Sequence, residues 1–104
     1  MTVNTNLVVE YIETLENAQR MYFHHGETMD YPYIEKTHNN EFMVSYYING
    51  GLSQYTTTVA SDAYNEAVKQ AGTGPLNISI GTQNPPSSLR LVSEIKYKIV
   101  PTCM

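Results

Sequence analysis

The dipeptide Asn49-Gly50 lies between two runs that have the composition of β-strands. Asn and Gly readily adopt the positive φ angles of a type I′ turn, and the twist of this turn suits the joining of two antiparallel strands. The flanking runs are rich in Tyr, Thr, Val and Ile, which favour strands. The sequence therefore predicts a β-hairpin in which Phe42 to Ile48 pairs with Leu52 to Ala60.

A helix is predicted directly after the hairpin, from about Asp62 to Ala71. Ser61 can cap its first turn, Asp62 suits the positive end of the helix dipole, and Gly72 can end the helix in a left-handed conformation. Its apolar stripe is narrow and consists of Ala63, Ala67, Val68 and Ala71. Such small side chains allow the helix to lie close to a sheet.

Two further strands are predicted towards the C-terminus. Apolar and polar residues alternate from Leu76 to Ile80, as in a half-buried strand. A longer alternation from Leu89 to Ile99 predicts a final strand with one polar face. Pro85-Pro86 cannot continue a ladder of hydrogen bonds, so the residues around it are expected to connect these strands as a loop.

The N-terminal part of the chain predicts one helix, from about Asn6 to Arg20, because its apolar residues recur at helical spacing. A short strand is expected near Arg20 to His24, and an irregular segment from Glu27 to Glu41. Together these elements predict a small single α+β domain spanning residues 1–104. Its sheet is antiparallel or mixed with four to five strands, and the N-terminal helix and a second short helix pack on it.

Charge divides the chain unequally. Residues 1–41 hold seven acidic and two basic residues, a net charge of −5, whereas residues 42–104 hold three acidic and four basic residues, a net charge of +1. A net charge of −4 argues against binding nucleic acid, whose phosphates attract basic surfaces. Acids interleaved with tyrosines suit a protein partner with a basic surface. The predicted partner-binding residues are Glu10, Glu13, Glu16, Asp30, Tyr31, Tyr33 and Glu35.

The residue types for metal or acid–base chemistry gather in one region, with His24, His25 and His38 near several carboxylates. Adjacent histidines point to opposite faces of a strand, which prevents easy chelation by both. No zinc, nucleophile or phosphate-loop motif accompanies them. The sequence therefore assigns no catalytic residue, no metal ligand and no cofactor, and Cys103 has no second cysteine with which to form an internal disulfide.

Three classes of function remain. The first is a small non-enzymatic binding protein that blocks or adapts a protein partner, which resembles in composition the accessory proteins and anti-defence inhibitors of phages and mobile elements. The second is a subunit of a virion or another assembly, whose strands pair between copies in a homo-oligomer. The third is a small metal- or ligand-dependent enzyme built around His24, His25 and His38. No apolar run is long enough to span a membrane, so a cytoplasmic location is expected, the host cytoplasm if a phage encodes the chain.

Overall fold

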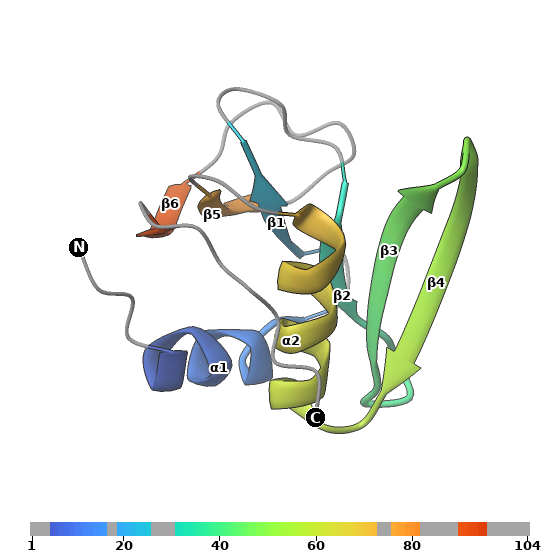
Figure 1. Ribbon diagram of the computed structural model, residues 1–104. Helices are drawn as coiled ribbons and strands as arrows, with labels where there is room; N and C mark the ends of the chain where they lie inside the picture. Colours follow the sequence, from blue (N-terminus) through green and yellow to red (C-terminus); the bar gives the residue numbers. More distant parts are fainter. Residues whose placement is uncertain (1–4, 17–18, 26–30, 73–75, 82–89, 96–104) are drawn as a thin grey trace.

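The computed structural model describes residues 5–16, 19–25, 31–72, 76–81 and 90–95, and of residues 90–95 only the backbone. Its elements follow one another in the order helix, four strands, helix, two strands (Figure 1). They are α1 (Thr5–Glu13), β1 (Arg20–His24), β2 (Tyr33–Lys36), β3 (Phe42–Ile48), β4 (Gly51–Thr57), α2 (Ala60–Ala71), β5 (Leu76–Gly81) and β6 (Arg90–Ile95). The predicted α+β class, with an N-terminal helix and a second short helix, is confirmed.

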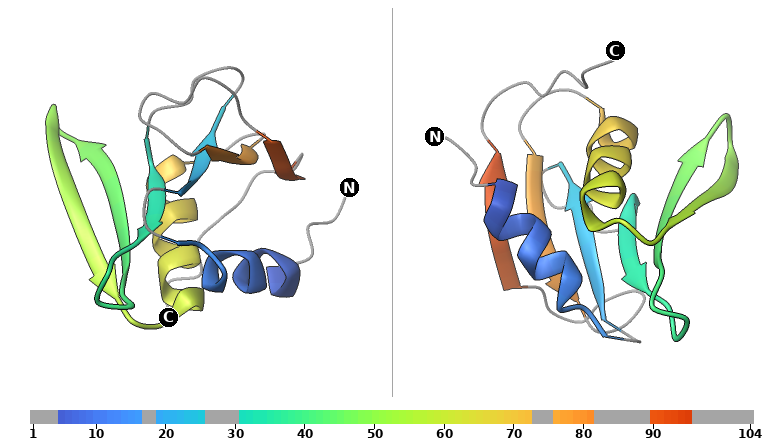
Figure 2. Two further views of the ribbon diagram at one scale, coloured as in Figure 1. Left: turned by 180° about the vertical axis from the view of Figure 1, so that it is seen from behind. Right: turned by 90° about the horizontal axis from the view of Figure 1, so that it is seen from below.

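The strands form one antiparallel sheet in the order β4-β3-β2-β1-β5-β6. Strands β1 to β4 are neighbours in sequence order, and α2 then returns the chain so that β5 pairs with the free side of β1. Both helices lie on the same face of the sheet (Figure 2). No helix of the described residues lies on the opposite face, and we call it the open face.

The core lies between the sheet and the two helices. Met21 and Phe23 of β1, Ile34 of β2 and Val44 of β3 are all fully buried on the helix-covered face. Phe23 packs against Tyr64 of α2 with the ring centroids 5.9 Å apart. The helices contribute Val8, Ile12, Ala60, Ala63, Tyr64, Ala67 and Val68, and Leu15 joins them from just after α1. The small residues of α2 are thus buried against the sheet, as the narrow stripe predicts.

Helix α1 ends at Glu13, although the sequence predicts a helix up to Arg20. At this end of the helix, the hydroxyl of Thr14 donates to the carbonyl oxygen of Tyr11 at 2.8 Å. The backbone N–H groups of Thr14 and Leu15 bond to residues three positions earlier, which tightens the last turn. Leu15, two residues beyond the end of α1, is nevertheless buried in the core.

Strand β2 lies inside the segment predicted to be irregular, so the sheet has six strands instead of four to five. Only four residues long, β2 is too short to establish a period of two in the sequence. Pairing with β1 and β3 on its two sides buries Ile34 completely. Tertiary pairing, rather than local pattern, therefore makes this strand.

The predicted hairpin is confirmed, with φ angles of 53° at Asn49 and 80° at Gly50. Its second strand, β4, ends at Thr57 and not at Ala60. Thr57 ends the strand because its hydroxyl accepts the N–H of Val59 at 3.1 Å and turns the chain towards α2.

The start of α2 differs from the sequence prediction. The helix begins at Ala60, the residue before it is Val59, and no side chain caps its first turn, so the predicted capping role of Ser61 is wrong. Asp62 does lie in the first turn, and the helix ends before Gly72, whose φ angle is 89°. The predicted final strand is present as β6, while the predicted continuation to Ile99 lies outside the described residues.

Candidate interaction surfaces

The residues predicted to bind a partner do not come together on one surface. Glu10, Glu13 and Glu16 are exposed on or just after α1, on the helix-covered side of the molecule. Tyr33 and Glu35 flank the buried Ile34 in β2, so their side chains point to the open face. Tyr31 is half-buried and Asp30 lies outside the described residues. The sheet therefore separates the acidic helix from the tyrosines.

Tyr33 and Glu35 are engaged inside the protein. Tyr33 is only 6% exposed, and its ring packs on that of Tyr22 with the centroids 5.4 Å apart. The guanidinium of Arg20 lies 4.4 Å from the centroid of the Tyr33 ring. The Nε atom of Arg20 is 3.5 Å from a carboxylate oxygen of Glu35. These contacts hold β1 and β2 together and leave Tyr33 little surface for a partner.

A row of four tyrosine rings crosses the open face. Beyond Tyr22 and Tyr33, Tyr31 lies 5.3 Å from Tyr33 and meets Tyr47 edge-on at 4.7 Å, centroid to centroid. Tyr22 is fully buried, whereas Tyr47 is 56% exposed. Burial raises the pKa of the Tyr22 hydroxyl above its ordinary value of 10.0, and a hydrogen bond with Arg20 acts in the opposite direction. The row connects the interior of the sheet to the exposed hairpin.

The histidines have structural contacts. His24 Nε2 lies 2.9 Å from the hydroxyl of Ser79, and both residues are buried. A serine and a histidine at this distance resemble a nucleophile and its base, but a substrate could not reach them in this conformation. His25 Nε2 donates to the carbonyl oxygen of Ala71 at 2.8 Å, at the end of α2. Within the described residues, no three His, Cys, Asp or Glu side chains are grouped to hold a metal ion.

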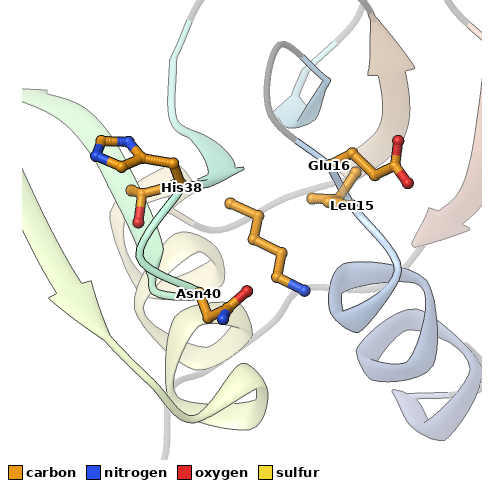
Figure 3. Close-up of a pocket in the computed structure, with 6 residues that line it drawn as sticks. Leu15, Glu16, His38 and Asn40 are labelled. Carbon is orange, nitrogen blue, oxygen red and sulfur yellow. The ribbon is translucent and has the colours of Figure 1, made fainter.

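A hollow of about 250 Å³ lies between the end of α1 and the turn from β2 to β3 (Figure 3). Its lining residues are Leu15, Glu16, Lys36, Thr37, His38 and Asn40. Thr37 stiffens the turn, because its hydroxyl accepts the N–H groups of Asn39 and Glu41. Lys36 and Glu16 bring opposite charges to the same small space. The hollow therefore has no strong preference for an anion or a cation.

The hairpin of β3 and β4 carries the most exposed apolar surface. Six large apolar side chains among the described residues are exposed, and five of them lie between Tyr47 and Val59. We define the hairpin surface as Tyr47, Ile48, Leu52 and Tyr55, which are 56%, 48%, 50% and 37% exposed. Tyr47 and Leu52 pair on the open face, and Ile48 and Tyr55 lie on the other. Both faces of the hairpin thus present apolar groups to solvent.

The outer half of the hairpin extends beyond the rest of the sheet. Strand β2 pairs with β3 only from Phe42 to Ser45, so the remaining residues of β3 pair with β4 alone. The resulting two-stranded ribbon stands away from the helices in Figure 1. Among the residues that the structure describes, β4 is the last strand on its side of the sheet and has no strand beyond it. Its outer backbone groups are therefore available to another chain.

The chain matches no protein-family model, no curated protein and no solved structure in comparisons with known proteins. No helix among the described residues is long and apolar enough to cross a membrane.

The sequence predicts the hairpin but not its exposed surface. One pattern could have revealed it, since residues 42–61 contain no acidic or basic side chain in a chain that is 15% charged. A neutral stretch of this length ordinarily indicates burial. Here Phe42, Val44, Ser45 and Ala60 are buried, whereas residues 46–59 are half-buried or exposed.

Proposed function

We propose that this chain is a small non-enzymatic binding protein that acts by contact with another protein, and that the hairpin surface makes the contact. One observation carries this proposal, namely the gathering of exposed apolar side chains on a projecting ribbon. Exposed apolar groups of this kind typically mark interaction sites, because covering them is favourable. Tyrosines such as Tyr47 and Tyr55 add large contact area at a small entropic cost.

The narrower class that we propose is an accessory protein of a phage or mobile element, of the kind that inhibits a host defence protein in the cytoplasm. Its support is compositional, from a chain of 104 residues with a low proportion of charged residues. Such a protein needs only a stable scaffold and one contact surface, since it acts by blocking its target.

Helix α1 offers a second contact to the same partner. Glu10, Glu13 and Glu16 are exposed and form no ion pair with any described residue. Exposed charges of one sign mainly raise the association rate of a partner with the opposite charge, and salt weakens this effect. We propose that these glutamates steer a basic partner, while the hairpin surface sets the lifetime of the complex.

A second candidate function is a subunit of a virion or another repeating assembly. The open edge of β4 favours it, because an exposed strand can pair with a strand of the next copy. The two candidates differ in the expected partner, which is a foreign protein in the first and the same chain in the second.

The proposal is tested by capturing partners from a host lysate with the purified protein and with two matched variants. Tyr47→Ala combined with Leu52→Ala removes the two side chains of the hairpin surface that lie on the open face. The control, Leu7→Ala, removes an equally exposed leucine from α1. The double variant should lose a captured partner and the control should retain it. A partner that binds the double variant as strongly as wild type would contradict the proposal.

The steering role has a kinetic test on any captured partner. Reversing Glu10, Glu13 and Glu16 to lysine should slow association and flatten its dependence on ionic strength, with little change in dissociation. Truncation of the hairpin surface should instead shorten the lifetime of the complex, about tenfold for each 1.4 kcal/mol lost. Equal effects of the two changes on association would contradict this division of roles.

A further inference from the structure

The outer edge of β4 has a regular set of unpaired backbone groups. Ile48 and Gly51 flank the two-residue turn and form a hydrogen-bonded pair, after which bonded and non-bonded pairs alternate along the ladder. Leu52, Gln54 and Thr56 therefore direct their N–H and C=O groups away from β3. These residues are also exposed.

This edge lacks the features with which proteins ordinarily prevent strands from pairing. Natural edge strands carry lysines, prolines or bulges that keep other chains away. Strand β4 has the sequence GLSQYTT, and its register with β3 runs without a bulge from Gly51 to Thr57. The edge is therefore open and contains no charge that would select a charged partner.

We propose that β4 pairs antiparallel with β4 of a second copy of this chain, around a twofold axis at Gln54. This inference goes beyond the proposed function, because it names a second copy of this chain, and not a foreign protein, as the partner of the β4 edge. Gln54 is the middle residue of β4, so an axis at this position places every residue of the strand opposite a residue of β4 in the other copy. The two sheets then join into one continuous sheet.

The side chains suit this self-pairing. On the open face, Leu52 of one copy lies opposite Thr56 of the other, and the two Gln54 amides meet at the axis and can bond to each other. On the opposite face, Ser53 lies opposite Tyr55. No like charges oppose each other, although the chain has a net charge of −4. The neutral stretch thus provides the part of the surface where two copies can approach without repulsion.

The outward backbone groups are arranged symmetrically around the axis. Leu52 bonds to Thr56 of the other copy and Gln54 to its own counterpart, and each such pair exchanges two hydrogen bonds. A single pair of strands buries less area than a standard interface of about 1,600 Å². We therefore expect a weak dimer whose fraction rises with concentration.

The first experiment measures mass in solution by analytical ultracentrifugation over a wide range of concentrations. Wild type should pass from monomer to dimer as the concentration rises.

Gln54→Pro removes an outward N–H from each copy at the axis, in a position that an edge strand tolerates, and should weaken the dimer about tenfold or more. Gln54→Lys places two like charges opposite each other and should weaken it several-fold. Thr58→Lys adds the same charge just beyond the strand and should dimerise more readily than Gln54→Lys.

The second experiment tests the register by disulfide cross-linking in a Cys103→Ser background. Opposite residues of a hydrogen-bonded pair have Cα atoms about 5.5 Å apart, which lies within the range for a disulfide. Gln54→Cys should therefore cross-link readily under mild oxidation. Thr56→Cys is the control, since its two copies would lie four residues apart in register, roughly 13 Å, and should cross-link poorly.

The results separate this inference from the proposed function. A concentration-dependent dimer that both Gln54 variants weaken, with normal thermal melts, supports it. A protein that stays monomeric at every concentration overturns it, and so does a dimer that Gln54→Pro leaves unchanged. If the monomer nevertheless loses a foreign partner on hairpin truncation, the proposed function stands and only the second copy as partner is wrong. If neither binding is seen, both proposals are wrong.

Discussion

The half of the sheet that carries β1 and β5 differs from the half that carries β3 and β4 in how much of each strand is buried. In β1, every residue from Met21 to His24 is buried, because strands flank it on both sides and helices cover one face. In β4, no residue is buried. Strand β1 is mostly apolar and flanked on both sides, whereas β4 is mostly polar and lies at an edge, so position and composition together decide which residues form the core and which can meet a partner.

The largest expected effect is a difference in unfolding free energy between two truncations, one in the core and one in the hairpin. Phe23→Ala removes a fully buried ring from the core and should cost about 3–5 kcal/mol of unfolding free energy. Leu52→Ala, at a position 50% exposed, should change it by less than about 0.5 kcal/mol in the monomer. Chemical denaturation at low protein concentration measures both. Similar losses for the two variants would mean that the hairpin is part of the core.

A second pair of variants compares two buried serines on the open face. Ser79→Ala leaves His24 buried without its hydroxyl partner and should cost about 1–3 kcal/mol. The hydroxyl of Ser45, fully buried between β2 and β4, has no hydrogen-bond partner among the described residues, so Ser45→Ala should be neutral or stabilising. Thermal melts distinguish them. Equal destabilisation by both variants would contradict the assigned role of the His24 contact.

A third prediction concerns the turn that shapes the hairpin. Gly50 has a φ angle of 80° and no atom within 4 Å of the position where a Cβ would lie, so backbone conformation alone opposes substitution. Gly50→Val should cost more than about 1 kcal/mol, because a β-branched residue resists positive φ. Gly50→Asn, whose side chain tolerates this conformation, serves as the control. An unchanged melting temperature for the valine variant would show that the turn is not needed for stability.

The smallest expected effect appears at alkaline pH. Burial raises the pKa of the Tyr64 hydroxyl in the folded protein above its ordinary value of 10.0. Above that pH the unfolded chain loses this proton before the folded protein does, so stability falls as the pH rises. Tyr64→Phe should make the fall shallower while leaving the packing against Phe23 in place. Unfolding curves from neutral pH to about pH 11 test this, and an identical slope in both proteins would contradict it.

Local patterns predicted the elements whose causes are local. The Asn49-Gly50 turn, β3 and the apolar stripe of α2 follow from backbone preference and periodicity, and the structure has them in place. Strand β2 was missed because its four residues become a strand only through neighbours on both sides. The first helix is shorter than predicted because the apolar pattern continues past Glu13, although the helix ends there in a turn tightened by the backbone bonds of Thr14 and Leu15.

Among the predicted binding residues that the structure describes, the exposed ones lie on or just after α1. Helical periodicity predicts that Glu10, Glu13 and Glu16 point away from the core, and all three are exposed. Tyr33 lies in the unpredicted strand β2, and sequence alone could not show that Tyr22 and Arg20 would cover it. The exposure of the hairpin likewise depends on strand order, which no local pattern contains.

Residue-resolved hydrogen exchange of β4 tests most directly whether its outer edge is an unfilled binding surface. In dilute solution, the amides of Ser53 and Tyr55 should be protected by β3, whereas those of Leu52, Gln54 and Thr56 should exchange rapidly. Raising the protein concentration should then protect the second set selectively, as a second β4 occupies the edge. Rapid exchange at Leu52, Gln54 and Thr56 that persists at every concentration would contradict self-pairing, and protection of these amides in the dilute monomer would contradict an open edge.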